Sequence, residues 1–311
     1  METVVISLNK ENKIETPVVA CIGFFDGLHL GHQALISKTL ELAKKHHAKS
    51  ALITFNPDPW VVIKDVKEYQ HLSTIKRREE LASKLGIDMI ITLDFTKEMS
   101  ALTPYDFLHK ALVPCSLKAL VCGFDFHYGL KGMGNPKILS DDAKEYFEVE
   151  VIDSVNEEDK KISTSRIVEY LEKGEIIHAN RLLGYSYQVE GTVIHGQKRG
   201  REIGFPTANI DVDAEYIIPK TGIYEGWINV ENEWYPAIIN IGHNPTFNYS
   251  NKLSIEAHIL NFNQQIYGQL VKLEFIKYLR EEMKFNSIDE LIAQMQSDKE
   301  TAKKDLIQHE E

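Results

Sequence analysis

The stretch Gly23-Phe-Phe-Asp-Gly-Leu-His-Leu-Gly-His32 decides the fold expected for the first part of this 311-residue chain. It follows an apolar run, Val18–Ile22, that predicts a buried strand, and it precedes residues 33–47, which have helical spacing. Two imidazoles, His29 and His32, therefore lie where a strand leads into a helix. The first N–H groups of a helix lack partners and carry a partial positive charge, so this turn is suited to bind a phosphate.

The glycines and histidines of this turn suit a phosphate that takes part in a reaction. Gly27 and Gly31 let a bulky ligand approach the backbone closely. His29 and His32 could then donate hydrogen bonds to a phosphate whose charge develops during the reaction. Two surface histidines without a role are the plainer alternative. Asp26 either orients an imidazole, approaches a bound cation, or stabilises the turn itself.

The composition is that of a globular protein with an acidic balance. Hydrophobic residues make up 43% and charged residues 26% of the sequence, and the formal net charge is −11. An acidic chain argues against nucleic acid as a partner. No apolar run approaches the roughly 20 residues needed to span a bilayer, and the N-terminus has no signal-peptide pattern. We expect small molecules as partners, whereas the sequence does not indicate an oligomeric state.

The cysteines point to a reducing compartment. Cys21, Cys115 and Cys122 are odd in number and widely spaced, so they predict neither a disulfide framework nor a zinc site. Buried free thiols are the expected state of such residues in the cytosol. The sequence therefore predicts a cytoplasmic protein.

The first half of the chain predicts an α/β domain. Its strand candidates are short, apolar and continuous, as expected of strands covered on both faces; they are residues 18–22, 51–55, 89–93, 119–122 and 149–152. Helical spacing between them covers residues 33–47, 74–85 and 104–112. This alternation predicts a parallel, Rossmann-like sheet with helices on both sides. Ligands of such sheets bind beyond the carboxyl ends of the strands.

The pattern changes around Gly184, after two predicted helices at residues 166–172 and 176–183. The strand candidates then alternate and are separated by turn residues; they are residues 185–194, 223–230, 234–241, 253–260 and 271–275. This pattern predicts an antiparallel sandwich or small β-barrel. The capping-box sequence Ser287-Ile-Asp-Glu290 begins a terminal helix, and the charged tail 303–311 is expected to fray. We therefore expect two domains, at residues 1–184 and 185–311.

Three further stretches of the first domain are suited to hold a ligand. Ser163-Thr164-Ser165-Arg166 offers hydroxyls and an arginine at a helix start, a second phosphate cradle, although capping by one hydroxyl is the plainer alternative. The two prolines of Asn56-Pro57-Asp58-Pro59 fix a loop that forms either a ligand wall or an ordinary turn. The stretch Gly123-Phe-Asp-Phe-His-Tyr-Gly129 offers aromatic rings that suit stacking or core packing. Two phosphate cradles without an activated nucleophile favour a triphosphate and direct displacement at its α-phosphate.

In the second domain a glycine-rich basic loop precedes a Pro-Thr-Ala-Asn segment. Gly196, Gly200 and Gly204 surround the clearest positive cluster of the acidic chain, formed by Lys198, Arg199 and Arg201. A solvated charged turn is the plainer reading. Thr207 and Asn209 lie two residues apart, hence on one face of an extended segment. Their oxygen atoms suit Mg²⁺ with its phosphates, and no Walker-type loop is present anywhere.

The strand candidate at residues 253–260 carries a possible general base. Its alternation places Glu256 and His258 on one face and apolar residues on the other. A carboxylate in this position is a candidate general base, and an exposed-face glutamate is the commoner alternative. The loop that begins at Asn240 could border the same site.

The first half resembles the adenylyltransferase half of prokaryotic bifunctional FAD synthetases over its full length. The string G-F-F-D-G-x-H-x-G-H and residues 123–129, which follow a G-x-D-F-x-F-G pattern with Tyr128 for the second phenylalanine, carry the resemblance. It implies that FMN is adenylylated by ATP with loss of pyrophosphate, and that His29 and His32 stabilise the transition state. The implied contacts with ATP and phosphate are Gly23, Phe24, Asp26, Gly31, Ser163, Thr164, Ser165 and Arg166; those with flavin are Asn56, Asp125 and Phe126.

Three residues depart from the pattern of that family. Asn56 and Asp58 replace the acidic residue and the histidine of an acidic-P-H-P sequence. Val168 replaces the final arginine of I-S-S-T-x-I-R, and Arg166 lies two residues earlier. Loss of one arginine that binds phosphate costs on the order of 1.5–3 kcal/mol. These departures predict a weaker adenylyl transfer.

The second half resembles riboflavin kinase throughout residues 185–300. The string G-x-x-x-G-R-x-I-G-F-P-T-A-N, the strand that bears Glu256, and Arg280, Phe285 and Asp298 further on carry the resemblance. It implies that Thr207 and Asn209 hold Mg-ATP and that Glu256 takes the proton from the riboflavin 5′-hydroxyl. The implied contacts with ATP and flavin are Gly196, Gly200, Arg201, Gly204, Phe205, Pro206 and Asn240. Two mild departures are Asn244 and Asn261.

Together these features predict a bifunctional enzyme that converts riboflavin to FMN and FMN to FAD, with ATP and Mg²⁺ in both steps. One alternative is a riboflavin kinase whose first domain is weak or inactive. A second is a first domain that transfers a nucleotide to another acceptor. A third is a flavin-binding regulator without turnover, against which the presence of Glu256 and both histidines counts.

Overall fold

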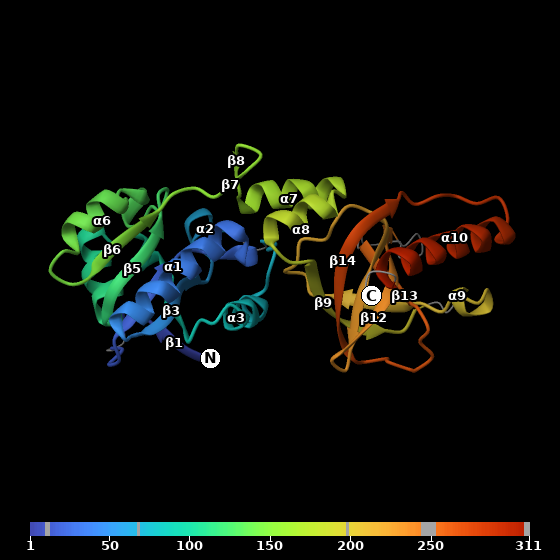
Figure 1. Cartoon of the computed structure of the whole chain (residues 1–311), viewed down its shortest axis with the longest axis horizontal. Helices are drawn as coiled ribbons and strands as arrows, with labels where there is room; N and C mark the ends of the chain where they lie inside the picture. Colours follow the sequence, from blue (N-terminus) through green and yellow to red (C-terminus); the bar gives the residue numbers. More distant parts are fainter. Residues whose placement is uncertain (10–12, 67–68, 197–198, 244–252, 308–311) are drawn as a thin grey trace. The chain divides into compact units, whose positions relative to one another are not determined.

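The computed structural model describes residues 1–9, 13–66, 69–196, 199–243 and 253–307 (Figure 1). Contacts within the chain divide it into two compact units, Met1–Thr164 and Ser165–Glu311. The division gives helix α8 (Ile176–Leu183) and nearly all of α7 (Thr164–Lys173) to the second unit. The domain boundary at residue 184 stays a prediction.

The first unit contains a six-stranded parallel sheet, as predicted. Its order is β1-β4-β3-β2-β5-β6, and every neighbouring pair is parallel. The strands are β1 (Glu2–Ile6), β2 (Val18–Ile22), β3 (Lys49–Asn56), β4 (Met89–Asp94), β5 (Leu117–Gly123) and β6 (Glu148–Ile152). All five residues of β2 are buried, because it is a central strand covered on both faces. Strand β1 was not predicted.

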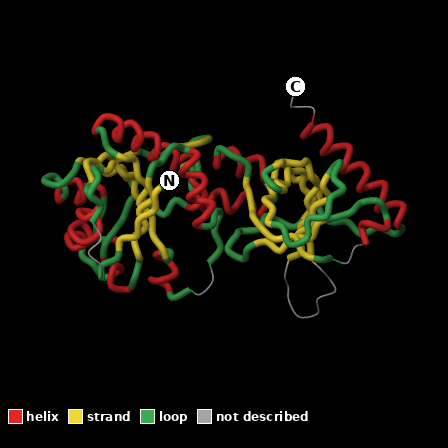
Figure 2. Tube along the Cα trace, turned by 90° about the horizontal axis from the view of Figure 1, so that it is seen from below, coloured by secondary structure: helices red, strands yellow, loops and turns green. Residues whose placement is uncertain are grey.

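Helical segments connect these strands and pack on the sheet (Figures 1 and 2). They are η1 (Asp26–Leu28), α1 (Leu30–His46), α2 (Pro59–Lys64), α3 (Ile75–Lys84), α4 (Lys97–Ser100), α5 (Pro104–Phe107), η2 (Leu108–Leu112), η3 (Val113–Cys115), η4 (Leu130–Gly132) and α6 (Pro136–Asp142). A two-stranded hairpin, β7 (Asn156–Glu157) and β8 (Lys160–Lys161), precedes α7. The helix predicted over residues 104–112 is α5 continued by the π-helical turn η2.

The strand order creates a switch point beside β2. From β2 the chain adds β3 and β4 on one side of the sheet, and it then crosses to place β5 and β6 on the other side. The carboxyl ends of β2 and β5 are therefore neighbours from which the chain leaves in different directions. In open α/β sheets ligands bind at such points. The histidine turn follows β2, and the stretch 123–129 follows β5.

The second unit contains a closed antiparallel barrel, in agreement with the barrel that the sequence predicts. Its strands follow the order β10-β13-β12-β11-β14-β9, and β9 pairs with β10 to close the ring (Figure 2). They are β9 (Tyr187–Ile194), β10 (Ala208–Val212), β11 (Gly222–Val230), β12 (Glu233–His243), β13 (Leu253–Ile259) and β14 (Leu270–Arg280). A short helix, α9 (Arg199–Glu202), lies in the connection between β9 and β10.

The terminal helix α10 (Ile288–Ile307) packs on β11 and β12. The capping box is present, since the Ser287 hydroxyl accepts from the Glu290 N–H at 3.2 Å, and the Glu290 carboxylate accepts from the N–H of Asn286 at 2.9 Å. Arg280 of β14 makes a two-pronged ion pair with Asp298 of α10, with a shortest distance of 2.7 Å. The prediction that the tail frays from residue 303 is wrong as far as residue 307, because α10 continues that far. The buried side chains of Ala302 and Leu306 anchor its last turns.

Cys21, Cys115 and Cys122 are free and buried, as predicted. Among the described residues, no helix combines the length and apolar character that crossing a bilayer requires.

Candidate active sites

The turn after β2 has an unusual backbone that places His29 at the start of α1. Phe25 adopts a left-handed conformation with φ of 58°, and Gly27 follows with φ of 75°. The Phe25 side chain is fully buried, so its packing offsets the strain of a left-handed non-glycine residue. The chain then makes the single turn η1, and His29 becomes the N-terminal cap of α1.

The cap fixes the tautomer of His29. Its Nδ1 accepts a hydrogen bond from the backbone N–H of His32 at 3.3 Å, so a neutral ring carries its proton on Nε2. The two imidazoles stack with ring centres 3.7 Å apart and 12° between their planes. A side chain at Gly31 would bring its Cβ within 3.1 Å of the His29 ring. Glycine at this position therefore leaves room for the stacked pair.

Both histidines are held in the neutral form. Burial lowers the pKa of His29 from 6.5 to about 4, and the nearby Lys161 charge adds to the effect. Burial also lowers the pKa of His32 well below its usual value, helped by His29, Arg78 and Lys161. Each ring therefore has one N–H to donate at neutral pH. Such donors, next to the free N–H groups of a helix, suit a phosphate oxygen.

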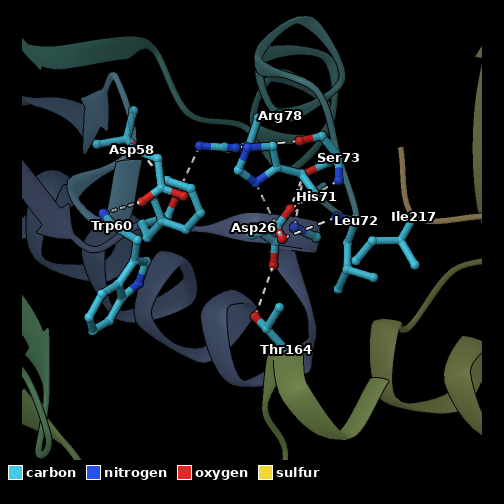
Figure 3. Close-up of polar contacts among 12 residues, drawn as sticks. Asp26, Asp58, Trp60, His71, Leu72, Ser73, Arg78, Thr164 and Ile217 are labelled. Carbon is cyan, nitrogen blue, oxygen red and sulfur yellow. Dashed lines mark hydrogen bonds and ion pairs between the residues drawn. The ribbon is translucent and has the colours of Figure 1, made fainter. Parts of the chain in front are cut away.

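Asp26 acts as an anchor for a distant loop (Figure 3). Its Oδ1 accepts from the backbone N–H of Ser73 at 3.0 Å and from the Ser73 hydroxyl at 3.2 Å, and Oδ2 accepts from the N–H of Leu72 at 3.1 Å. The Ser73 hydroxyl in turn accepts from the N–H of Gly27 at 2.9 Å. The carboxylate is only 3% exposed. Of the roles considered for Asp26, the structure favours fixing the turn over direct contact with ATP.

Arg78 is a cation beside the turn that sequence reasoning missed. Its Nη1 donates to the carbonyl of Phe24 at 3.1 Å, and its guanidinium lies 4.6 Å from the centre of the Phe24 ring. Arg78 lies on α3, which was predicted only as an amphipathic helix, yet its side chain is 5% exposed. No local signal reveals its role, because it reaches Phe24 from 54 positions later in the chain. The predicted contact residue Phe24 thus belongs to the site, with a positive charge over its ring.

Two predicted departures from the family lie at the end of β3. Asn56 is the last residue of β3. Asp58 caps α2, because its Oδ1 accepts from the N–H of Trp60 at 2.9 Å (Figure 3). Burial raises the pKa of the Asp58 carboxyl, while Trp60, His71 and Arg78 oppose the shift. A helix that begins at the second proline, Pro59, therefore takes the place of the expected loop wall or turn.

Of the predicted hydroxyl cluster at residues 163–165, the hydroxyl of Thr164 contacts the histidine turn. The hydroxyl of Thr164 lies 3.5 Å from the carbonyl oxygen of Asp26, to which it donates. The neighbouring backbone carbonyl of Ile162 lies beside Gly31. Ser165 and Arg166 fall in the second unit, where Arg166 stacks on Tyr170 and donates to its hydroxyl at 3.2 Å. The guanidinium of Arg166 is thus engaged along its own helix. Ser163, which precedes Thr164, is half-buried.

A cavity of about 920 Å³ opens at the carboxyl ends of the strands in the first unit. Its wall includes five aromatic residues, which are Phe55, Trp60, Phe95, Phe107 and Tyr128. Asp125 also lines the cavity and forms an ion pair with Lys161 of β8. Phe126 packs against the core and stacks on Tyr128 instead, and Asn56 is not among the lining residues. Of the three predicted flavin contacts, only Asp125 borders this cavity.

In the second unit three polar residues form a row across neighbouring strands. Glu256 of β13 pairs with Asn209 of β10 on one side and with Asn240 of β12 on the other. Directly paired residues project to the same face of a sheet. The hydroxyl of Thr207 donates to Oε2 of Glu256 at 3.1 Å. The structure therefore brings together Thr207, Asn209 and Glu256, and it places beside them Asn240, whose loop was expected to border the same site.

The oxygen atoms of this row suit a hard cation. Thr207 offers a hydroxyl, Asn209 an amide and Glu256 a carboxylate, and Oδ1 of Asn240 is buried with no hydrogen-bond partner in the described part of the chain. Mg²⁺ prefers oxygen ligands of these kinds. The donor set therefore fits the predicted cation.

The glycine loop passes close to the same row. A Cβ at Gly196 would collide with the Asn209 amide, and one at Gly200 would collide with the carbonyl of Phe205. Gly204 has φ of 84°, which favours glycine. Gly196 and Gly200 thus let the backbone lie against the segment that carries Thr207. The side chains of Arg199 and Arg201, together with Lys198 and Asn244, lie outside the described residues.

Comparison with known proteins follows the same division of the chain. The family model for FAD synthetase matches residues 11–166, and that for riboflavin kinase matches residues 183–306. The bifunctional riboflavin kinase/FMN adenylyltransferase of Listeria monocytogenes is 41% identical and covers 91% of this chain and 90% of its own length. The chain belongs to the bifunctional riboflavin kinase/FMN adenylyltransferase family.

Two further matches agree with membership of this family. The protein of the same name from Bacillus subtilis is 38% identical, with 91% of each chain covered. A crystal structure from Streptococcus pneumoniae, titled as a macrolide-efflux protein, superposes with a TM-score of 0.87 at 30% identity and covers 97% of this chain and 99% of its own. Its title names an activity that neither family model describes, so we take only the fold from it. The resemblance that the motifs predict is confirmed over both units.

Proposed function

We propose that the second unit phosphorylates riboflavin to FMN and that the first unit adenylylates FMN to FAD, each with ATP. For the kinase, the row of Asn209, Glu256 and Asn240 with Thr207 beside it carries the proposal, because it joins a general base to oxygen ligands. For the adenylyltransferase, the pair of stacked, neutral imidazoles at the start of α1 carries it.

In the kinase step Glu256 accepts the proton of the riboflavin 5′-hydroxyl. The hydroxyl oxygen forms a bond to the γ-phosphorus of ATP, the bond from that phosphorus to ADP breaks, and FMN and ADP result. Thr207 and Asn209 would hold Mg²⁺, which neutralises charge on the phosphates when bound. Gly196, Gly200 and Gly204 precede this segment and would let the backbone approach the phosphates closely. Phe205 and Pro206 join the loop to Thr207.

In the adenylyl-transfer step a phosphate oxygen of FMN attacks the α-phosphorus of ATP, and pyrophosphate leaves. His29 and His32 donate to the phosphate oxygens on which charge develops, with the free N–H groups of α1 beside them. Arg78 adds a fixed positive charge behind Phe24. The aromatic cavity, with Tyr128 and Asp125 in its wall, is suited in size and character to the flavin ring.

One incubation tests both activities. Purified protein is mixed with riboflavin, ATP and Mg²⁺, and the flavins are separated by chromatography. We expect FMN and then FAD. With His29→Ala we expect FMN without FAD, and with Glu256→Gln we expect no FMN from riboflavin but normal FAD when FMN is supplied. Loss of both activities in either variant would refute independent sites, and the absence of any product would favour a flavin-binding regulator.

A riboflavin kinase with a weak first domain is the second candidate. It is favoured by Asp58, which caps a helix where the family has a histidine, and by Arg166, which stacks on Tyr170. Accumulation of FMN with little FAD, even when FMN and ATP are both in excess, would select it. We also propose a cytoplasmic location, which the three buried, unpaired thiols support.

A further inference from the structure

His258 lies beside the proposed general base, and no step above uses it. It follows Glu256 by two residues on β13 and projects to the same face. Its side chain is 7% exposed. Nδ1 lies 2.9 Å from the carbonyl oxygen of Pro206, whereas Nε2 is buried without a hydrogen-bond partner among the described residues. A carbonyl only accepts, so Nδ1 carries the proton.

The carbonyl of Pro206 needs such a donor because the sheet ladder stops beside it. The last pair between β10 and β13 joins Ala208 to Ala257. Pro206 lies before the start of β10 and has no N–H of its own. The imidazole of His258 therefore supplies the hydrogen bond to this carbonyl at the point where the backbone pairing ends.

Two side chains of β13 thus form hydrogen bonds with two consecutive residues of the segment that leads into β10. His258 donates to the Pro206 carbonyl, and Glu256 accepts from the Thr207 hydroxyl at 3.1 Å. The preceding residue, Phe205, is buried with its ring centre 5.2 Å from that of His258, and its N–H donates to the carbonyl of Gly200 at 2.8 Å. The position of Thr207 relative to the base therefore depends on the peptide that His258 holds.

We infer that His258 is a positioning residue for phosphoryl transfer, which fixes the Pro206–Thr207 peptide so that the Thr207 hydroxyl and Glu256 meet. The inference rests on the proposed kinase function. It requires a proton on Nδ1, the form that the 2.9 Å contact with the carbonyl oxygen of Pro206 indicates.

Two substitutions separate the donor from the bulk of the ring. His258→Phe keeps a ring but removes the donor, and His258→Asn places an amide N–H near the position of Nδ1. We expect His258→Phe to lower the kcat of riboflavin phosphorylation and to weaken binding of Mg-ADP, measured by calorimetry, by about fivefold each, as for loss of one net hydrogen bond. His258→Asn should restore most of both values. FAD formation from supplied FMN should not change in either variant, because the first unit carries that activity.

A matched control and a spectroscopic measurement complete the test. His178→Phe, which removes a half-exposed imidazole from α8 of the same unit, should leave the kinase unchanged. In ¹⁵N NMR of the wild-type protein, His258 should carry its proton on Nδ1 at pH 7. A neutral ring with its proton on Nε2 would overturn the inference even if His258→Phe does not fold.

The remaining outcomes are also decisive. A His258→Phe variant with wild-type kcat and Mg-ADP affinity would overturn the positioning role, as would a His258→Asn variant that is as impaired as His258→Phe. If the wild-type protein forms no FMN, the proposed kinase function fails, whatever the variants show.

Discussion

The buried carboxyl of Glu225 should make the second unit less stable as the pH rises. This residue of β11 is 1% exposed, and its Oε2 has no hydrogen-bond partner among the described residues. The nearest cation, Lys277 of β14, lies 3.9 Å away and is held by Asp305 of α10 at 2.6 Å. Burial raises the pKa of Glu225 from 4.5 to about 7, Lys277 opposes the shift, and Asp305 adds to it.

The direction of this pH dependence follows from the pKa values of Glu225 in the folded and the unfolded chain. The folded protein keeps the Glu225 proton up to about pH 7, whereas the unfolded chain loses it near pH 4.5. Its contribution to stability is thus fully present below pH 4.5 and is lost as the pH rises through 7. The whole difference corresponds to about 3 kcal/mol, of which about 2 kcal/mol falls between pH 5.5 and pH 8. For a unit of this size that is a change in Tm of roughly 4–8 °C.

Calorimetric unfolding of wild-type protein and Glu225→Gln at pH 5.5 and pH 8 measures this effect. Glutamine resembles the protonated acid at every pH, so the variant should be more stable than the wild type by about 1 kcal/mol at pH 5.5 and by about 3 kcal/mol at pH 8. Glu215→Gln, which changes an exposed carboxylate of the same unit, serves as the control and should follow the wild type at both pH values. The reasoning is refuted if Glu225→Gln keeps the wild-type difference between the two pH values.

Three further perturbations test other parts of the structure. Arg280→Met leaves the buried Asp298 with the Gln294 amide but without its cation, so α10 should loosen at a cost of about 3–5 kcal/mol, seen as faster hydrogen exchange in that helix. Asp26→Ala removes the acceptor of three hydrogen bonds from residues 72 and 73, and FAD formation should fall at least tenfold while FMN formation is unchanged; an unaltered FAD rate would contradict an anchoring role. The Cε1 proton of His29 should titrate near pH 4 in NMR, and a midpoint near 6.5 would show that the ring is exposed to water.

The sequence predicts the strands well where a strand is a continuous apolar run. Strand β2 has the predicted bounds, and β3, β4, β5 and β6 extend the predicted ranges by only a few residues. Strand β1 is an edge strand with exposed side chains, so its apolar signal is weak. Helix α2 was not predicted, because the two prolines indicated a loop. A proline nevertheless fits the first turn of a helix, and Asp58 caps α2.

The candidate sites were predictable only where their residues share one segment. The face that Glu256 shares with His258 follows from alternation along a single strand. The pairing of Glu256 with Asn209 and Asn240 depends on register between strands, which alternation does not give. Ser73 and Arg78 reach the histidine turn from a different connection of the sheet, so nothing near residues 23–32 indicates them.

The hydrogen bond from Thr207 to Glu256 has a consequence for selectivity. A hydroxyl has one proton, and in this structure Thr207 gives it to the carboxylate. Any species that approaches the oxygen from another side meets only lone pairs. A cation is attracted there, whereas a bare phosphate oxygen is repelled. If the proposed kinase step holds, this hydrogen bond makes the Thr207 oxygen better suited to a metal-bound nucleotide than to the free anion.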